Sequence, residues 1–190
     1  PRVQARWLIA IGFVITGFAL LHMSGFSLQM SFWHVMLART FQSAGLAFLF
    51  IPISVAAYAF IPMEKNNNAS ALLSVARNLG GSFGISMVTT YLARQTQIHQ
   101  HALVSHLTPY DQAYQQTLHG LTNLLISQGV APGQAGHEAM GMIYGSLVRQ
   151  SAMLAYLDNF RIMGVFVFVL IPVVVLLMRP IKGGEHPAAH

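Results

Sequence analysis

Four long apolar blocks constrain the fold of this chain more than any other feature of its sequence. They lie at about residues 7–24, 35–61, 69–92 and 158–179. Each block is close to the roughly 20 apolar residues that a helix needs to cross the hydrocarbon layer of a bilayer. Only 8% of the 190 residues are charged, whereas a soluble domain carries about 25%. The blocks therefore predict an all-α membrane protein with four transmembrane helices.

Helices are expected in these blocks rather than strands. No ten-residue stretch alternates between apolar and polar residues with a period of two, as a membrane barrel requires. In lipid, a helix satisfies its backbone hydrogen bonds within its own segment. Polar residues 64–68 separate the second and third blocks and predict a tight connection between two helices.

Residues 93–157 separate the third and fourth blocks. A structureless loop of this length is uncommon in a compact protein. Thr108-Pro109 predicts a helix start, with Pro109 at the first helical position and Asp111 in the first turn. Residues with apolar or aromatic side chains then recur at helical spacing, at Tyr110, Tyr114, Leu118, Leu121 and Leu125. We interpret this part of the chain as a helical extracytoplasmic segment.

The Lys and Arg residues near the block ends predict the orientation in the membrane. One side collects Arg2, Arg6, Lys65, Arg179 and Lys182. The other side collects Arg94, Arg149 and Arg161. This bias places both chain ends, including a tail at 180–190, in the cytoplasm, and it places residues 93–157 outside.

Arg77 is the most informative single residue, because it lies about two helical turns inside the third block. A charged residue at the centre of a membrane helix costs about 2.5–3.5 kcal/mol on insertion scales, so its side chain should face protein or a watery cavity. Small or polar residues share its face at helical spacing: Ser70, Ser74, Gly81 and Gly84. This stripe predicts that Arg77 lines a cavity, where it attracts an anionic group, orders water or pairs with an acid. Alternatively, Arg77 reaches the cytoplasmic headgroups or binds carbonyl groups of a neighbouring helix.

Glycine and proline mark two positions where helices are expected to pack. Gly80 and Gly84 form a G-x-x-x-G spacing, with Gly81 beside them, and small residues of this kind let helix backbones approach closely in lipid. Pro52 lies inside the second block and removes one backbone hydrogen bond. It is expected at a packed position, and a kink used in gating is the alternative.

Two pairs of polar residues are three positions apart and so share a helix face. Arg39 and Gln42 lie near the outer end of the second block, where they could line a substrate pathway. Alternatively, Arg39 reaches the outer interface. Asp158 and Arg161 mark the start of the fourth block, and we expect them to form an interfacial ion pair. A proton-carrying role for Asp158 is the alternative.

Several classes of function are excluded or disfavoured by the sequence. Cysteine is absent, which excludes a disulfide framework and a thiolate metal site, and the histidines of residues 93–157 lack a zinc spacing, so no metal is expected. Phosphate-binding loops and hydrolase motifs are missing, so neither an enzyme nor a cofactor is predicted. The net charge is +5, but the basic residues are scattered at membrane flanks, so no nucleic-acid partner is expected.

Three runs of residues carry a resemblance to a known family. They are Ala38 to Gly45 followed by Phe50-Ile51-Pro52, then Asn67 to Ala71 with Ala76 to Ile85, and finally Gln150 to Phe160. In order and spacing they resemble the EmrB/QacA-type drug:proton antiporters, the fourteen-helix branch of the major facilitator superfamily. The resemblance implies four transmembrane helices from the C-terminal part of such a transporter, with a large outer loop before the last helix. The chain begins with proline, which we also take to indicate a piece of a longer protein.

The resemblance implies proton-driven multidrug efflux by alternating access, with multi-pass insertion in the bacterial inner membrane. The partners it implies are membrane lipid, small amphipathic substrates and protons, and for some members also a periplasmic adaptor and an outer-membrane channel. Ser43 stands where the family commonly has glycine, with little expected consequence. Two alternatives stay open: a major facilitator permease for a metabolite or siderophore, and a non-transporting membrane scaffold subunit.

Overall fold

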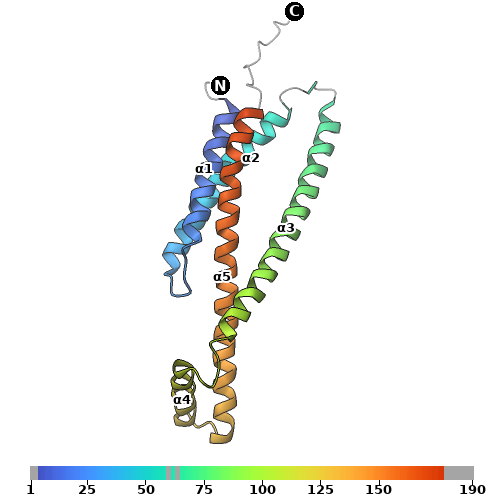
Figure 1. Ribbon diagram of the computed structural model, residues 1–190. Coiled ribbons are helices and arrows are strands. Elements are labelled where there is room, and N and C mark those ends of the chain that lie inside the picture. The colour runs from blue at the N-terminus through green and yellow to red at the C-terminus, as the bar shows by residue number, and fades with distance from the viewer. Residues whose placement is uncertain (1–3, 59–60, 63–64, 178–190) are drawn as a thin grey trace, which may run out of the picture. The chain divides into compact units, whose positions relative to one another are not determined.

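The computed structural model describes residues 4–58, 61–62 and 65–177 and consists of helices joined by short connections (Figure 1). The helices are α1 (Ala5–Met23), α2 (Phe32–Tyr58), α3 (Asn66–Val104), α4 (Gln112–Ser127) and α5 (Pro132–Leu177). No strand occurs within these described ranges, and the predicted all-α fold class is confirmed. The predicted tail at 180–190 lies outside the described residues.

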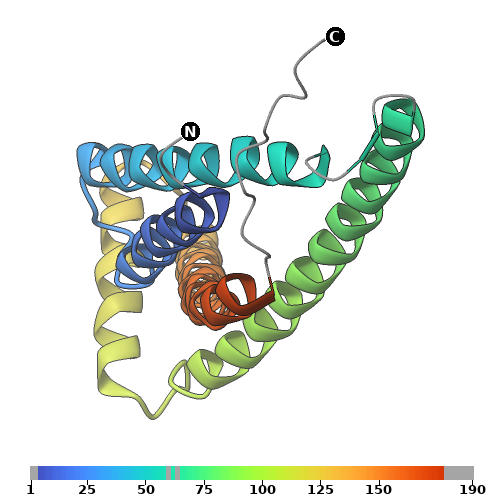
Figure 2. The ribbon, with the colours of Figure 1, turned by 90° about the horizontal axis from the view of Figure 1, so that it is seen from above.

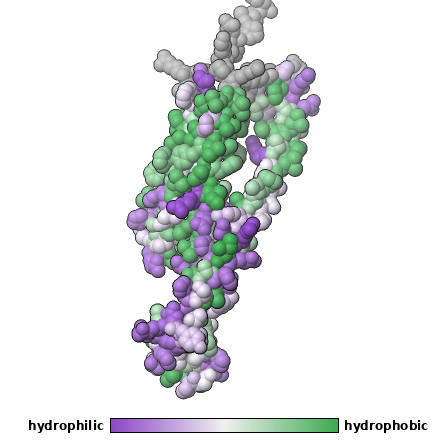
Figure 3. All heavy atoms as spheres, viewed as in Figure 1, coloured by the Kyte–Doolittle hydropathy of each residue, from purple (hydrophilic) through white to green (hydrophobic). Residues whose placement is uncertain are grey.

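The chain divides into two compact units, and each is described by itself. Unit 1 comprises Pro1–Met87 and Asn159–His190, and unit 2 comprises Val88–Asp158. Helices α3 and α5 contribute residues to both units. Hydrophobic side chains cover much of the surface of unit 1 (Figure 3), as a surface facing lipid or further helices requires.

Three helices are long and apolar enough to cross a membrane. The qualifying segments are Arg6–Met23, Phe32–Val55 and Pro132–Leu177. Helix α3 contains the predicted span 69–92 but is not among them. Its 39 residues include many polar side chains, beginning with three asparagines, which lower its mean hydropathy. The four predicted spans and their boundaries therefore stay predictions.

Helices α1 and α2 cross at a point where two glycines remove the side chains between them. A Cβ atom on Gly45 of α2 would collide with the Thr16 hydroxyl and lie 2.9 Å from the Thr16 amide nitrogen. A Cβ atom on Gly12 of α1 would lie 3.0 Å from the Gly45 carbonyl oxygen. The two backbones are therefore in direct contact, which is the packing that small residues permit in lipid.

The C-terminal part of α5 packs on another side of α1. Gly17 lies against the ring of Phe168, and Gly164 lies against Leu21. The rings of Phe18 and Phe168 meet edge to face, with centroids 5.3 Å apart, a favoured geometry for aromatic pairs. Seen from above, α1 lies between α2 and the end of α5 (Figure 2). Helix α1 is thus the central element of unit 1.

Helix α3 is most exposed in its unit 1 part. None of its residues is buried, although several in unit 2, such as His99 and Gln100, are half-buried. A Cβ atom added at Gly80, Gly81 or Gly84 would meet nothing within 4 Å. In the described part of the chain, no helix packs against these glycines. The predicted helix packing there would need a helix from outside the described residues, so it stays a prediction. Pro52, in contrast, is buried in α2.

The start of α4 differs from the sequence prediction. The helix begins at Gln112 rather than at Pro109. Asp111 is its N-cap, with a carboxylate oxygen that accepts hydrogen bonds from the amides of Ala113 at 2.9 Å and Tyr114 at 3.2 Å. A capping aspartate satisfies amides that have no partner within the helix. The side-chain cap, and not the fixed φ of proline, therefore sets the helix start.

Helix α4 ends at a glycine and folds back on α5. Gly129 has φ +94°, a conformation that glycine adopts readily. The Val130 amide donates to the Leu125 carbonyl at 3.0 Å and the Gly129 amide to the Ile126 carbonyl at 3.0 Å, the pattern of a Schellman C-cap. Leu125 then packs with Ala135 and Ala139 of α5 in a small core. Unit 2 therefore has an apolar core of its own.

We predict that Gly45→Ala loosens the α1–α2 crossing. The added methyl group meets backbone atoms, which cannot rotate away, and overpacking of this kind typically costs about 1–3 kcal/mol. The measurement is the thermal unfolding midpoint of the chain in detergent micelles, which should fall. Gly84→Ala is the matched control, because its Cβ points into open space in this chain. Equal midpoints for the two variants would contradict the described crossing.

Candidate functional site

Arg39 and Gln42 form a polar pair on α2. The Nη1 atom of Arg39 donates a hydrogen bond to Oε1 of Gln42 at 2.9 Å. Arg39 is exposed and Gln42 is half-buried. The structure thus brings together the two residues that the i, i+3 spacing singled out. The amide holds one donor of the guanidinium and leaves its positive charge unneutralised.

Arg77 of α3 lies over the ring of Phe50 of α2. The guanidinium carbon is 5.1 Å from the ring centroid, within the range of a cation–π contact. Both side chains are exposed, Phe50 by 58%. The sequence prediction for Arg77 did not identify Phe50, because nothing local connects two residues 27 positions apart. The one available signal was that a cation inside a span needs a partner.

Arg39 and Phe50 belong to the same face of α2. They are 11 residues apart, which corresponds to about three turns and about 16 Å along the axis. We call this face the α2 stripe, defined as Arg39, Gln42, Ser43, Leu46, Phe50 and Ile53. Apart from half-buried Gln42, its members are exposed. The stripe is therefore an accessible surface with a cation near one end and, through Phe50, a second cation near the other.

The charges of unit 1 have a single sign in its described part. No Asp or Glu occurs among the residues that the structure describes there, whereas Arg39 and Arg77 both do. The three described carboxylates, Asp111, Glu138 and Asp158, all lie in unit 2. No salt bridge to either arginine is found within the described ranges. Within the described part of unit 1, the two arginines predicted to line a pathway therefore have no carboxylate partner.

Ser70 and Ser74 are the remaining residues predicted to line a pathway. Both are exposed on α3, one and two turns before Arg77. They keep the helical spacing that the sequence analysis used, so they share a face with Arg77. The described contacts join this face to the α2 stripe only through Arg77 and Phe50.

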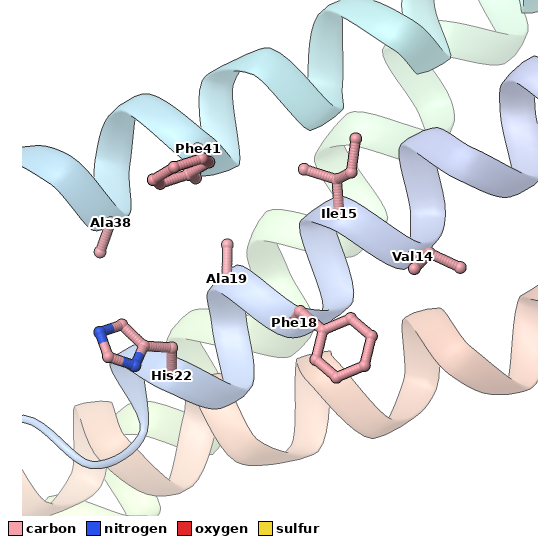
Figure 4. Close-up of a pocket in the computed structure, with 7 residues that line it drawn as sticks. All are labelled: Val14, Ile15, Phe18, Ala19, His22, Ala38 and Phe41. Atoms are coloured by element: carbon pink, nitrogen blue, oxygen red, sulfur yellow. The ribbon is translucent and has the colours of Figure 1, made fainter.

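Two apolar grooves flank the α1–α2 crossing. The larger has a volume of about 340 Å³ and is lined by Val14, Ile15, Phe18, Ala19, His22, Ala38 and Phe41 (Figure 4). His22 is its one titratable lining residue, and its imidazole meets the Phe26 ring edge to face. The second groove, of about 280 Å³, is lined by residues that include Pro52 and Leu8. Both grooves suit acyl chains or apolar side chains.

Asp158 has a different partner from the predicted one. Its Oδ2 atom is 2.6 Å from Nε2 of His99, so the carboxylate of α5 is bound to an imidazole of α3. From the adjacent residue of α3, Nε2 of Gln100 donates to the hydroxyl of Tyr144, which precedes Asp158 on α5, at 2.8 Å. Two polar contacts therefore join α3 to α5 in unit 2. The sequence analysis considered the histidines of residues 93–157 only as possible zinc ligands, and it did not identify this pair because His99 and Asp158 are 59 residues apart. Arg161, the predicted partner, is exposed.

We predict that His99 and Asp158 are energetically coupled. The side chains are 26% and 37% exposed, so solvent screens the pair and a coupling of about 1 kcal/mol or less is expected. A double-mutant cycle with His99→Gln and Asp158→Asn, read from the thermal midpoint in detergent, measures this coupling. His101→Gln, at an exposed position of the same helix, is the control. Strictly additive effects of the two substitutions would show that the pair contributes nothing.

Comparison with known proteins gives the following relatives. The fatty acid resistance protein FarB of Neisseria gonorrhoeae is 26% identical over 183 residues, which cover 96% of this chain and 34% of that protein. The colistin resistance protein EmrB of Acinetobacter baumannii is 23% identical over 169 residues, 89% of this chain and 32% of that protein. The probable multidrug resistance protein EmrY of Escherichia coli is 22% identical over 180 residues, which cover 94% of this chain and 33% of that protein.

The chain thus spans about a third of the length of these curated relatives. No family model matches it. No solved structure matches it either. The relatives are EmrB-, FarB- and EmrY-type transporters of the major facilitator class, and the family resemblance predicted from the sequence is confirmed.

Proposed function

We propose that this chain is the C-terminal part of a proton-driven exporter of amphipathic compounds in the bacterial inner membrane. The observation that carries the proposal is the α2 stripe, an exposed face on an apolar helix with an unneutralised arginine near each end. Intramembrane charges of this kind mark substrate or ion pathways. The relatives are named for resistance to fatty acids, colistin and several drugs, which fits a pathway for amphipathic compounds.

The mechanism follows from an exposed pathway between two groups of helices. In secondary transporters, two halves rock around a site near the bilayer midplane. The α2 stripe and the open face of α3 would form one wall of that site, with the other wall supplied by helices outside this chain. Because the described part of unit 1 has no carboxylate, the main proton-binding group would also belong to another part of the transporter.

Unit 2 would lie outside the cytoplasm, with the C-terminus of the chain inside. This orientation follows from the Lys and Arg bias and fits the polar surface of α4. Elsewhere in unit 2, apolar or aromatic side chains are exposed, including Tyr110 before α4 at 96% exposure and Met142 on α5 at 51%. Exposed aromatic and methionine side chains are enriched at protein interfaces. Unit 2 is therefore the proposed docking surface for a periplasmic adaptor, which in turn would bind an outer-membrane channel.

We predict that Arg77→Ala lowers efflux of a lipophilic dye by about tenfold or more in cells that produce the full-length protein. Removing a charged hydrogen-bonding group from a binding site typically costs about 1.5–3 kcal/mol. The measurement is the rate of dye loss with and without an uncoupler that collapses the proton gradient. Arg94→Ala is the matched control, since Arg94 is exposed on the same helix but beyond the predicted span.

The same assay distinguishes the alternatives. Dye loss that is unaffected by deleting the gene argues against multidrug efflux, and would favour a permease for a metabolite or siderophore or a non-transporting scaffold subunit. Dye loss that depends on the gene but not on the proton gradient would contradict the antiporter mechanism.

We further predict that a photo-reactive residue at position 110 or 142 cross-links to a periplasmic adaptor. These positions expose apolar or aromatic side chains on unit 2. The same residue at Leu79, which is 67% exposed on α3 inside a predicted span, is the control and should not form this adduct. The measurement is mass spectrometry of cross-linked products from intact cells. An adaptor adduct from position 79 alone would place the docking surface elsewhere.

A further inference from the structure

We propose that His99 and Asp158 form a proton-binding site in unit 2, which holds α3 and α5 together more strongly when the imidazole is protonated. The proposal goes beyond the transport function, and it rests on that function only for the side of the membrane on which unit 2 lies. Both residues belong to unit 2, whose residues 88–158 are all described.

The pair joins two helices through a single short contact. Nε2 of His99 on α3 is 2.6 Å from Oδ2 of Asp158 on α5. It is the one ion pair within the residues of unit 2. The two side chains are 26% and 37% exposed. Protons from the solvent therefore reach the imidazole, although the contact itself is partly shielded.

The strength of this contact depends on the charge of the imidazole. Histidine is the side chain whose charge changes between about pH 5 and 8. A protonated imidazole adds the attraction of an ion pair to its hydrogen bond with the carboxylate. A neutral imidazole donates to the carboxylate only in the tautomer with its proton on Nε2. The link between α3 and α5 should therefore be strongest at acidic pH and weaken as the pH rises through this range.

A second polar contact joins the same two helices but should not respond to pH in this range. Nε2 of Gln100 donates to the Tyr144 hydroxyl at 2.8 Å, and neither an amide nor a phenol changes charge between about pH 5 and 8. Between Tyr144 and Asp158, one face of α5 is buried at a spacing of four residues, at Leu147, Ser151 and Ala155. The pH-sensitive contact and the constant one thus lie on either side of this buried face.

Few other groups near the pair change charge in the same pH range. His101 is exposed and lies two positions from His99, so the two imidazoles do not share a face of α3. His106 lies beyond the end of α3, in a groove that Asp111 and Tyr114 also line. The other ionisable side chains of residues 88–104 and 144–161 are tyrosines and arginines, whose charge is constant in this range: Tyr91, Arg94, Tyr144, Arg149, Tyr156 and Arg161.

Helix α4, the remaining helix of unit 2, packs far from the pair. Its leucines contact Ala135 and Ala139 near the start of α5. At its other end, it lines a groove together with Ile143. Ile143 and Asp158 are 15 residues apart, which corresponds to about 22 Å along α5. A pH response of the α3–α5 link should therefore depend on His99.

The site is placed where it can respond to the proton gradient that would drive transport. Helices α3 and α5 both continue from unit 2 into unit 1, where they contain the predicted spans 69–92 and 158–179. In the proposed orientation, unit 2 faces the acidic side of an energised membrane. Proton binding shifts the equilibrium toward the arrangement that keeps the imidazolium beside the carboxylate. The link would thus be strong while the outer side is acidic and weaker when its pH rises.

The test is the distance between α3 and α5 in the full-length protein in nanodiscs, measured by double electron–electron resonance. Nitroxide labels are attached to Gln97→Cys on α3 and Gln150→Cys on α5, because both positions are exposed. This chain has no cysteine, and any cysteine elsewhere in the protein is replaced by serine. Both sides of the nanodisc have the same pH, so the result does not depend on the orientation of unit 2.

We expect the ratio of the short-distance to the long-distance population to fall by up to about fivefold between about pH 5.5 and about pH 8.5. This is the range expected for an ion pair that is partly screened by solvent. Two substitutions fix the charge at position 99. His99→Gln is neutral and should give the lower ratio at both pH values. His99→Lys is charged throughout this range and should give the higher ratio at both.

His101→Gln is the matched control and should keep the full pH response, because this exposed histidine of α3 does not share a face with His99. Asp158→Asn should lose the response, as His99→Gln does. Equal distance distributions at both pH values in the protein with native His99 would overturn the proposal. A full pH response in His99→Gln would overturn it as well, because another group would then be titrating.

The outcome is separate from that of the transport assay. Dye efflux that depends on the gene and on the proton gradient, together with a distance that does not depend on pH, would reject this proposal alone. A pH-dependent distance that is lost in His99→Gln, in a protein that exports no dye, would reject the transport function alone.

Discussion

The arrangement of unit 1 depends on the direct backbone contact between α1 and α2. Lipid tails are as apolar as leucine, so burying apolar side chains gives little gain when helices associate in a membrane. Close approach gives dispersion contacts instead, and it needs residues without side chains at the crossing point. Gly45 and Gly12 satisfy this need, and Thr16, one turn after Gly12 on α1, lies against Gly45. The Thr16 hydroxyl is buried without a hydrogen-bond partner in the described structure. The close approach of the two helices therefore leaves one polar group without a hydrogen bond, which is unfavourable.

The same principle explains why α3 is open. Its glycines are as suitable for close packing as those of α1 and α2, yet nothing in the described part of the chain lies within 4 Å of a Cβ atom added at Gly80, Gly81 or Gly84. An unburied helix that has small residues on one face and an arginine near the same level is unsatisfied in two respects, packing and charge. Both deficits are removed if further helices and an anionic ligand complete the site. The exposed surface of α3 is therefore consistent with a chain that spans about a third of its relatives.

The sequence predicted what depends on local spacing and missed what depends on the tertiary arrangement. The all-α class follows from the apolar blocks, and the Arg39–Gln42 contact follows from an i, i+3 spacing on one helix. The partner of Asp158 could not be found in this way, because His99 belongs to another helix and Arg161 was the nearest opposite charge in the sequence. The start of α4 was wrong by three residues because proline was weighted above the capping carboxylate of Asp111.

The glycine prediction shows the limit of motif reasoning more sharply. The G-x-x-x-G spacing at Gly80 and Gly84 is visible in the sequence, whereas Gly12 and Gly45 belong to two different helices and form no such motif. The structure places the close contact at the second pair. A small-residue motif shows that a helix face can pack closely against another helix. Which faces are packed in the structure depends on how all the helices are arranged.

The charge distribution suggests how proton coupling and substrate binding can be separated in such a transporter. A carboxylate placed beside Arg77 would form a salt bridge with it, lowering the pKa of the acid and neutralising the cation. Neither group could then serve its function well, because the acid must take up a proton near neutral pH and the cation must stay available to an anion. The described part of unit 1 contains no such carboxylate. The two events would then be linked through the rocking of whole helices, since a ligand shifts a conformational equilibrium only by its difference in affinity for the two states.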